Sequence, residues 1–390
     1  MEPCVISYLP LSFWYPPLSL DYLPSTSFSS PILTHLNINV DTFDDCLHLL
    51  DGRFRKLTTL CVNVFHMNRF SDAVYNTDKL LNLKCFSLKS RNPFHQYDKI
   101  VLPFRRMSNL EKLTLNISIE SRNKIVNDTY VQHDILDYMP QLHSFTFYIC
   151  TYVNLNVLSY KLSSEDIQQT LINNGQQHVR SMASYVTNIV KLPLGIRTAC
   201  SIFSLPFKFD YLQDIGNHFP NIVFNYVTYL GIQDITPFEY EFFMRIARSF
   251  PLLKYLSIRN GESQKLDGVM TFSSDKCQLH SIIEYPHLAI LDARFAHEDY
   301  VEQFLNEAKT FVPCLTEFKV SVGHIKAVTK DFTREETRRN CAKMKKITTT
   351  GVSKIGETCI IVPRSIREQA STITVPPERT PKLFCTMVFI

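Results

Sequence analysis

The sequence predicts an α/β fold in which a short strand–helix unit recurs along the chain. The pattern Leu-x-x-Leu-x-Leu, with other apolar residues allowed, occurs nine times. Successive copies begin 24, 26, 27 and 32 residues apart in the first half and 26, 35 and 27 apart in the second. The segments that follow several copies have a helical period. This combination predicts a degenerate leucine-rich-repeat solenoid, in which neighbouring units stack because no unit can bury its apolar face alone.

Each copy is predicted to form a strand with one buried face, because apolar residues alternate with polar ones. The three apolar positions are Leu33, Leu36, Ile38; Leu57, Leu60, Val62; Leu83, Phe86, Leu88; Leu110, Leu113, Leu115; Leu142, Phe145, Phe147; Val227, Leu230, Ile232; Leu253, Leu256, Ile258; Leu288, Leu291, Ala293; and Leu315, Phe318, Val320. The strands are expected to form a curved parallel sheet on the concave side, with helices on the convex side. An ordinary α/β domain with leucine-rich parallel strands is the alternative. The constant offset of the three apolar positions favours the repeat.

Helices are predicted after several of these strands. The segment 41–54 has Asp41 as N-cap and one apolar face, and Gly52 ends it. In 236–250 a helix begins at Pro237, and in 297–311 aromatic residues recur at helical spacing. A terminal helix is expected at about 332–346, with Thr333 as N-cap and Glu336 in its first turn.

The predicted array covers residues 31–346 and is flanked by less regular chain. Residues 1–30 are rich in proline and serine and are predicted to be a flexible lead. Residues 149–226 interrupt the spacing, although "IFSLPF" at 202–207 is a candidate degenerate repeat. Pro206 weakens that candidate because proline removes a donor from the sheet. Residues 347–390 lose the pattern and are expected to be a disordered or loosely packed tail.

Composition places the chain among soluble globular proteins. It has 390 residues, of which 45% are hydrophobic and 20% charged. The net charge of +4 is too small to imply a nucleic-acid partner by itself. The 11 cysteines are scattered and no two are close enough to form a CxxC motif, which is typical of reduced thiols. The apolar start of the chain is broken by prolines, and no apolar run is long enough to span a membrane. We therefore expect a cytoplasmic protein, with the nucleus as the alternative location.

Catalytic and cofactor motifs are not found in the sequence. There is no glycine-rich phosphate loop, GxSxG elbow, HExxH motif or calcium loop. The acidic pairs Asp44-Asp45 and Glu335-Glu336 point apart on a helix and are better suited to supporting a helix N-terminus than to acid–base chemistry. We therefore expect no enzyme activity, no cofactor and no metal. An enzyme on an α/β core would require convergent polar residues in a deep pocket.

Binding is expected on the concave face, through the residues that alternate with the buried apolar positions. Tyrosine and arginine are the residue types enriched at interface hot spots. The candidate protein-binding residues are Tyr229, Tyr255, Arg259, Arg294 and Lys319. The alternative is a nucleic-acid-associated adaptor that uses the basic residues within 338–346. Glu335 and Glu336 dilute that charge, which favours an ordinary solvated helix face.

Five segments resemble F-box/leucine-rich-repeat proteins, in particular a divergent expanded family of F-box-like invertebrate proteins. These segments are "FDDCLHLLDGRF" at 43–54, "SLPFKFDYL" at 204–212, "PFEYEFFMRIARSFPLLKYLSI" at 237–258, "AHEDYVEQFL" at 296–305 and "FTREETRRNCAKMKK" at 332–346. The resemblance implies a substrate receptor of an SCF-type ubiquitin ligase, with a protein substrate and a ligase adaptor as partners. Members of that family begin with an F-box of Leu-Pro and an amphipathic helix, and the prolines of residues 1–30 are incompatible with that helix. The resemblance therefore covers the repeat portion alone.

Overall fold

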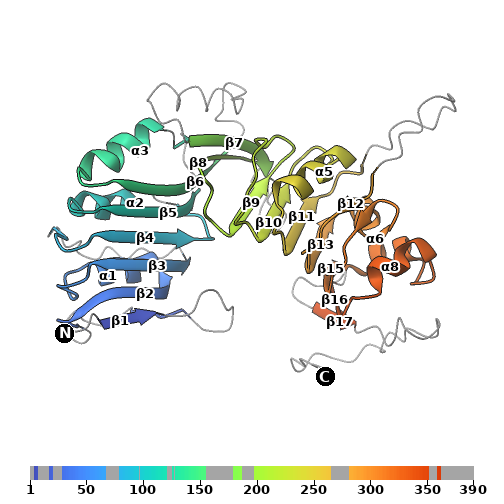
Figure 1. Cartoon of the computed structure of the whole chain (residues 1–390), viewed down its shortest axis with the longest axis horizontal. Helices are drawn as coiled ribbons and strands as arrows, with labels where there is room; N and C mark the ends of the chain where they lie inside the picture. The colour runs from blue at the N-terminus through green and yellow to red at the C-terminus, as the bar shows by residue number, and fades with distance from the viewer. Residues whose placement is uncertain are drawn as a thin grey trace.

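The computed structural model describes residues 4–7, 17–20, 29–66, 79–95, 97–120, 125–126, 128–154, 179–186, 197–264, 281–350 and 358–361. These residues form a mixed α/β structure with two large sheets, which are mostly parallel. Figure 1 shows the sheets as the two limbs of an arch, with β1 and β17 at the open ends. The α/β class predicted from the sequence is confirmed.

The first sheet contains eight strands in the order β1-β2-β3-β4-β5-β6-β8-β7. They are β1 Cys4–Ser7, β2 Leu33–Thr42, β3 Thr59–His66, β4 Cys85–Ser90, β5 Lys112–Ile119, β6 Ser144–Asn154, β7 Val179–Val186 and β8 Arg197–Ser204. Strands β1 to β6 are parallel and follow chain order. Strands β8 and β7 then close this sheet in antiparallel pairing.

The second sheet contains seven strands in the order β17-β16-β15-β13-β11-β10-β9. They are β9 Tyr211–Ile215, β10 Tyr229–Gln233, β11 Tyr255–Asn260, β13 Ile290–Ala296, β15 Glu317–Ser321, β16 Lys346–Thr350 and β17 Thr358–Ile361. All neighbours are parallel except β16 and β17. Two short strands, β12 Ile283–Glu284 and β14 Thr310–Phe311, pair separately.

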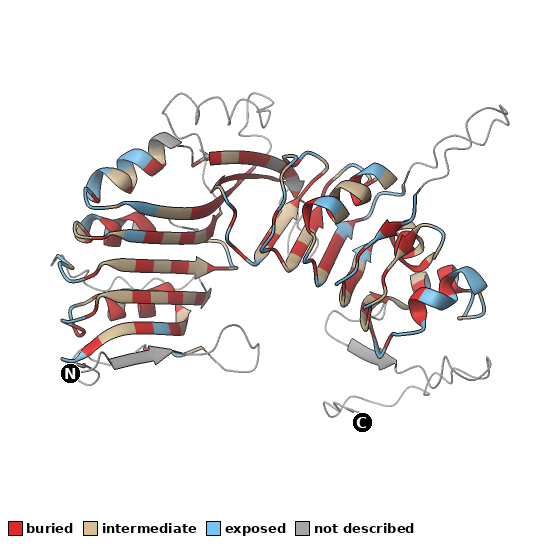
Figure 2. Cartoon of the chain, in the orientation of Figure 1, coloured by how far each residue is buried: buried red, intermediate tan, exposed pale blue. Residues whose placement is uncertain are grey.

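The repeated apolar positions align across neighbouring strands. In the first sheet Leu36, Leu60, Phe86, Leu113 and Phe145 are successive partners in register. In the second sheet the same row runs through Leu230, Leu256, Leu291 and Phe318. Buried and less buried residues alternate most clearly along β3 and β4 (Figure 2). The strand positions predicted from the nine copies are therefore confirmed.

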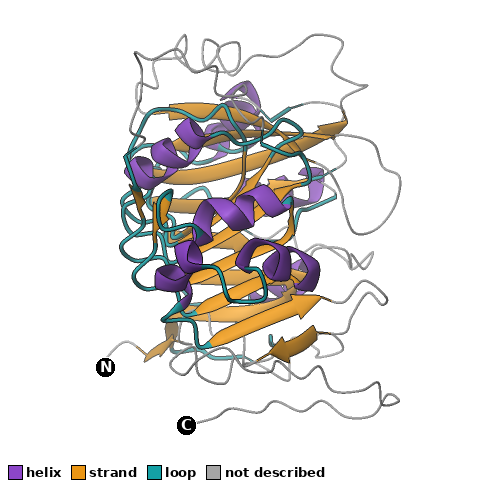
Figure 3. Ribbon diagram, turned by 90° about the vertical axis from the view of Figure 1, so that its right-hand side faces the viewer, coloured by secondary structure: helices purple, strands orange, loops and turns teal. Residues whose placement is uncertain are grey.

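The described residues contain seven α-helices: α1 Phe43–Leu49, α2 Tyr97–Val101, α3 Asp128–Asp134, α5 Tyr240–Ser249, α6 Glu298–Leu305, α7 Val322–Thr329 and α8 Arg338–Cys341. Three 3-10 turns accompany them: η1 Leu102–Arg106, η2 Leu136–Tyr138 and η4 Glu335–Thr337. In the second sheet the helices lie on the face turned away from the first sheet (Figures 1 and 3). The other face of the second sheet is therefore turned toward the first.

Helix α1 is capped by Thr42 and not by Asp41. Thr42 accepts a hydrogen bond from the Asp45 backbone N–H, and the Asp45 carboxylate accepts from the Thr42 backbone N–H, which completes a capping box. Asp45 also accepts hydrogen bonds from the Thr42 hydroxyl and from the backbone N–H of Leu20. This carboxylate is fully buried, so it supports the helix N-terminus and joins the start of the chain to the sheet.

Replacing Asp45 with alanine is expected to lower the free energy of unfolding by about 2 kcal/mol. The change removes the capping box and leaves the buried N–H of Leu20 without its acceptor. Urea unfolding measures the loss. As a control, alanine at the neighbouring Asp44 leaves the capping box intact and is expected to cost less; an equal loss at the two positions would contradict this role.

Helices α5 and α6 each bury an aromatic face in one shared core. Phe238, Phe242, Ile246 and Phe250 are all buried, as their spacing predicts, although α5 begins at Tyr240 and not at Pro237. The Phe243 ring of α5 meets the Phe304 ring of α6 edge to face, with centroids 5.4 Å apart. Burial of such large rings supplies much of the stability of this half of the chain.

The predicted flexible lead at 1–30 is wrong for its described residues. Strand β1 pairs with β2, and Leu18 forms a parallel bridge with Val40. Leu20 is only 1% exposed. Leu20 packs into the core of the first sheet; the rest of 1–30, apart from 4–7, 17–20 and 29–30, lies outside the described residues.

The irregular segment 149–226 contains a change of strand direction. Strand β6 runs to Asn154, and its next neighbour β8 is antiparallel to it. The candidate repeat at 202–207 is wrong, because Ile202 lies in β8, which is antiparallel to both of its neighbours and ends at Ser204, before Pro206. The parallel strand that begins the second sheet is instead β9, a few residues later.

The long terminal helix predicted at 332–346 is wrong. Helix α7 ends at Thr329, and Lys330, Asp331 and Phe332 all adopt left-handed backbone conformations, which reverse the chain. Only the short turn η4 and the four-residue helix α8 follow. Amphipathic spacing alone cannot detect this reversal.

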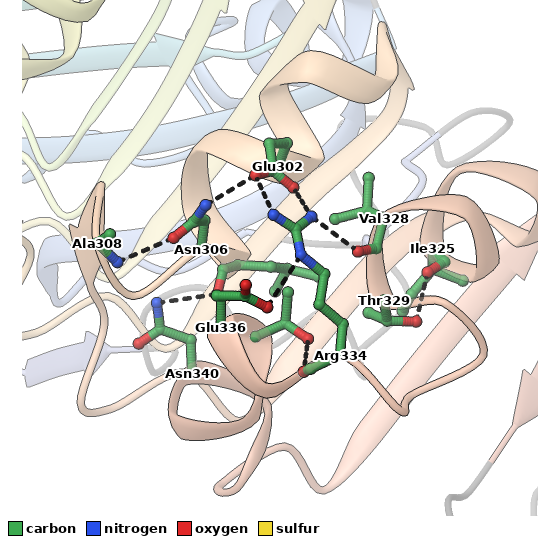
Figure 4. Close-up of polar contacts among 11 residues, drawn as sticks. Glu302, Asn306, Ala308, Ile325, Val328, Thr329, Arg334, Glu336 and Asn340 are labelled. Atoms are coloured by element: carbon green, nitrogen blue, oxygen red, sulfur yellow. Dashed lines mark hydrogen bonds and ion pairs between the residues drawn. The ribbon is translucent and has the colours of Figure 1, made fainter.

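A network of polar contacts holds the reversed segment in place (Figure 4). Arg334 donates two hydrogen bonds to the Glu302 carboxylate, at 2.5 Å and 3.0 Å, and a third to the carbonyl of Val328 at 3.2 Å. The Asn340 amide donates to the carbonyls of Phe304, Leu305 and Thr310. These contacts tie α8 to α6 and allow the chain to re-enter the sheet.

The predicted loose tail at 347–390 is wrong for its first residues. Strand β16 adds to the parallel sheet, with Ile347 beside Phe318 and Thr349 beside Val320. Strand β17 then pairs with β16. The sheet therefore extends to Ile361, and residues 362–390 lie outside the described part of the chain.

Candidate functional site

Three tyrosines form a stack across the inner face of the second sheet. Tyr211 on β9, Tyr229 on β10 and Tyr255 on β11 are partners in register. Their ring centroids are 4.5 Å and 4.4 Å apart, with interplanar angles of 26° and 24°. We call these three residues the tyrosine stack. Successive side chains of a strand point to opposite faces of the sheet, and the three tyrosines lie on the face that is turned away from the helices.

The Tyr255 end of the stack is held by three charged residues on the next strands. Asp292 on β13 accepts a hydrogen bond from the Tyr255 hydroxyl at 3.1 Å. Arg294 binds the same carboxylate through two nitrogens, at 2.9 Å and 2.7 Å. The Lys319 ammonium on β15 lies 3.3 Å from the Tyr255 hydroxyl and 5.1 Å from its ring centroid. Tyr255 is therefore fixed in orientation by a partly buried ion pair and a cation.

The electrostatics of Asp292 agree with this geometry. Burial raises the pKa of its carboxyl, but the hydrogen bond and charge of Arg294 outweigh burial and hold the pKa below its usual value. Burial and the Asp292 charge raise the pKa of the Tyr255 hydroxyl. The hydroxyl therefore remains protonated at neutral pH and donates to Asp292.

The first sheet reaches the stack through Arg91, which follows β4. Its guanidinium carbon lies 4.5 Å from the Tyr211 ring centroid and 5.9 Å from that of Tyr229. Both distances are within the range of cation–π attraction. A residue of one limb of the arch therefore contacts the tyrosine stack of the other.

A groove of about 590 Å³ lies between the two sheets at this point. We call it the tyrosine groove. Its described lining combines the tyrosine stack with residues from β3 to β5, the segment after β4, and β15: Asn63, Val64, Phe65, Lys89, Ser90, Arg91, Asn92, Asn116 and Lys319. Lys89, Arg91 and Lys319 are charged, and none of these lining residues is acidic.

A polar pocket of about 470 Å³ continues from the groove and shares Arg91, Asn92 and Tyr211 with it. The Tyr211 hydroxyl donates to Gln213 at 2.5 Å, and the Gln213 amide donates to the Tyr152 hydroxyl at 3.2 Å. Tyr152 in turn donates to the Asp214 carboxylate. Arg259 also lines this pocket.

Asp214 is a half-buried residue whose carboxyl has a perturbed pKa. Burial raises the pKa of its carboxyl, and this effect exceeds the opposing influence of the Tyr152 hydrogen bond and of the Arg259 and Arg197 charges. Its φ of 58° lies in the left-handed region, which asparagine and aspartate tolerate better than most residues. The carboxylate is therefore held in the pocket at an energetic cost.

Replacing Asp214 with asparagine is expected to raise the free energy of unfolding at neutral pH. An unfolded aspartate titrates near pH 3.9. Because the folded pKa of Asp214 is higher, its contribution to stability is greatest below pH of about 3.9 and falls as pH rises through the folded pKa. The gain from D214N, measured by urea unfolding, should therefore shrink as pH falls toward about 4.

The matched control is Asp292→Asn, for which the opposite sign is expected. The folded pKa of Asp292 is lowered, so its contribution is present above the unfolded pKa and is lost as pH falls. D292N should therefore destabilise the protein at neutral pH. Equal effects of the two substitutions would contradict the pKa directions.

The structure places four of the five candidate residues at this site and the fifth beside it. Tyr229, Tyr255 and Lys319 line the tyrosine groove, and Arg259 lines the polar pocket. Arg294 instead holds Asp292, which positions Tyr255.

Sequence reasoning missed Tyr211, Arg91 and Gln213. Tyr211 precedes an apolar residue as Tyr229 and Tyr255 do, but its strand lies only 18 residues before β10 in register, outside the repeat spacing. Arg91 comes from the other half of the chain, and no local pattern indicates its contact with Tyr211.

The basic segment 338–346 is partly neutralised in the structure. Arg338 pairs with Glu335 and Lys346 with Glu317, at 3.1 Å and 3.0 Å. The Arg339 guanidinium lies 4.2 Å from the Phe311 ring centroid. Three of the basic side chains that could bind a phosphate backbone, Arg338, Arg339 and Lys346, therefore already have partners within the chain.

The described residues contain no group of three or more histidine, cysteine, aspartate or glutamate side chains that could hold a metal ion. Burial raises the pKa of the Cys150, Cys200 and Cys341 thiols to about 12, so these three are poor nucleophiles at neutral pH. None of the helices in the described ranges has the length and apolar character needed to cross a bilayer.

Comparisons with known proteins leave the site to be interpreted from its own geometry. The chain matches no family model, no curated protein and no solved structure.

Proposed function

We propose that this chain is a leucine-rich-repeat solenoid that acts as a non-enzymatic protein-interaction module. Aligned rows of buried apolar residues across successive parallel strands support the repeat interpretation. The tyrosine groove lies on the inner face, opposite the helices of the second sheet. The partner protein binds there.

The tyrosine stack is the observation that carries this proposal. The three side chains are half-buried, so part of each ring remains accessible in a groove with mostly apolar walls. Rigid tyrosines lose little conformational entropy on binding, and those at the centre of an interface contribute most to affinity. Asp292 and Arg294 fix the stack before the partner arrives, which reduces the cost of ordering it.

Site-specific photocrosslinking tests the proposed binding face. A photoreactive phenylalanine analogue is placed at position 229 in the groove and, in a separate variant, at position 226. Tyr226 is a suitable control because it is 53% exposed and does not line the groove. A crosslink to one partner protein from position 229 and not from 226 is expected. Identical crosslinks from both positions, or none from 229, would overturn the proposal.

The resemblance to F-box/leucine-rich-repeat proteins extends this proposal to ubiquitin ligation. The module would present its bound partner to an SCF-type ligase when an F-box is supplied. Calorimetric titration of the full chain with the purified core ligase adaptor tests this extension. Lack of heat at adaptor concentrations up to about 100 μM would leave the general scaffold function alone.

A further inference from the structure

All the charged residues among the described lining of the tyrosine groove are basic, although Lys319 is paired with Glu317, which also lies on β15, at 3.9 Å. Lys89, Arg91 and Lys319 line the groove, and Arg259 lines the adjoining polar pocket. Neither Lys89 nor Arg259 has a carboxylate of the described residues within the 4.0 Å of an ion pair, although Arg259 is near enough to Asp214 for its charge to lower the pKa of that carboxyl. Of the two carboxylates of the polar pocket, Glu120 is paired with Arg197, and Asp214 is half-buried and accepts a hydrogen bond from Tyr152. The groove and its extension are therefore suited to an anionic ligand.

The geometry of the tyrosine stack indicates which kind of anion fits. Tyr229 is covered on both faces, by Tyr211 on one side and Tyr255 on the other. The stack therefore offers ring edges and not open faces to the groove. Aromatic edges carry partial positive charge, which favours contact with carboxylates and with the face of another ring. A single-stranded nucleic acid would instead need open faces on which its bases could stack.

The apolar part of the groove wall favours a ligand that carries an apolar or aromatic side chain. Phe65 lies at the first-sheet side of the groove and is partly exposed, whereas the side chain of the neighbouring Val64 is buried in the core. An apolar or aromatic side chain of the ligand can pack against Phe65 while neighbouring carboxylates reach Lys89 and Arg259. Asn63 and Asn116 can bond a peptide backbone in the same groove.

Resting on the proposed function above, we propose that the occupant of the groove is an acidic peptide segment with interspersed aromatic residues. Its aromatic side chain packs against Phe65 and the edges of the tyrosine stack. Its carboxylates bind Lys89, Lys319 and, in the polar pocket, Arg259. The partner protein is thus recognised through an extended acidic segment.

Fluorescence anisotropy with defined peptides tests this specificity. The probe is a fluorescein-labelled peptide in which pairs of glutamates alternate with phenylalanine. Matched peptides carry glutamine or lysine in place of glutamate, and labelled oligouridylate represents single-stranded RNA. The full chain is expected to bind the glutamate peptide at least tenfold more tightly than the glutamine peptide, with affinity falling as salt rises.

Charge-reversal variants locate the binding site. Lys89→Glu and Arg259→Glu are each expected to weaken the glutamate peptide about tenfold. Lys254→Glu is the matched control: it changes the net charge equally and lies just before β11, but it does not line the groove or the pocket. This variant should bind the peptide as the wild-type chain does, and thermal unfolding verifies that all three variants are folded.

Several results would overturn the inference. These are equal binding of the glutamine peptide, undetectable binding of the glutamate peptide, or equal loss in all three variants. Tighter binding of oligouridylate that is lost in K89E would identify the groove as an RNA site instead. If photocrosslinking at position 229 still captures a partner while the glutamate peptide fails, the proposed function stands and only the acidic specificity is wrong.

Discussion

Replacing Asn340 with leucine is expected to lower the free energy of unfolding by about 4 kcal/mol. The Asn340 amide donates to the carbonyls of Phe304, Leu305 and Thr310, and its oxygen accepts from the Val312 N–H. The residue is 2% exposed, so water cannot replace these contacts. Leucine has a similar volume and offers no polar atom, and each buried group left without a partner costs about 1–3 kcal/mol.

The same substitution at Asn109 provides the control. Asn109 donates one hydrogen bond, to the carbonyl of Leu81, at an exposed site. There water can solvate the carbonyl, so N109L should cost less than about 1 kcal/mol. Urea unfolding of both variants measures the difference. Comparable losses at the two positions would show that Asn340 does not hold the terminal segment.

Replacing Tyr229 with alanine is expected to weaken binding of the partner captured at the groove about a hundredfold. Tyr229 is the centre of the tyrosine stack and contacts both Tyr211 and Tyr255. Truncation removes its own contact area and its stacking contacts with the two outer rings. A central tyrosine of this kind costs about 2–4 kcal/mol at interface hot spots, which corresponds to this loss of affinity.

Surface plasmon resonance with the captured partner measures this loss. Tyr226→Ala is the matched control, since Tyr226 lies in the turn before β10 and outside the groove. Circular dichroism and thermal unfolding should show that both variants retain the fold. Affinity that is unchanged in Y229A, or that falls equally in Y226A, would exclude the tyrosine stack as the binding surface.

Local pattern was sufficient to predict the strands of the nine copies and their parallel pairing, but not β1, β7, β8, β9, β16 and β17. Leu256 and Ile258 are buried at the positions that the Leu-x-x-Leu-x-Leu spacing indicates, and Leu256 pairs with Leu230 and Leu291. These predictions succeed because the alternation of buried and exposed residues along a strand depends only on residues that are close together in the sequence. The same spacing predicts that Tyr229 and Tyr255 lie on one face of the sheet, because they occupy equivalent positions of successive units.

Predictions failed where contacts between distant segments override local preference. The chain from 329 to 346 has helical spacing, yet the left-handed Lys330 to Phe332 and the bonds of Arg334 to Glu302 reverse it. The proline-rich start was predicted to be flexible. Leu20 is nevertheless buried, and its backbone N–H donates a hydrogen bond to the Asp45 carboxylate. In both cases the decisive partner lies roughly 25 or more residues away.

By itself, the sequence determined the repeated strands, their buried faces and the candidate residues that project from the opposite face. The tertiary structure alone decided that Tyr211 joins Tyr229 and Tyr255, because β9 enters the sheet only after the antiparallel strands β7 and β8. It also decided that Arg91 reaches this stack from the other sheet. The physical reason is that alternation along a strand is a local property, whereas the approach of two sheets depends on how the chain between them turns.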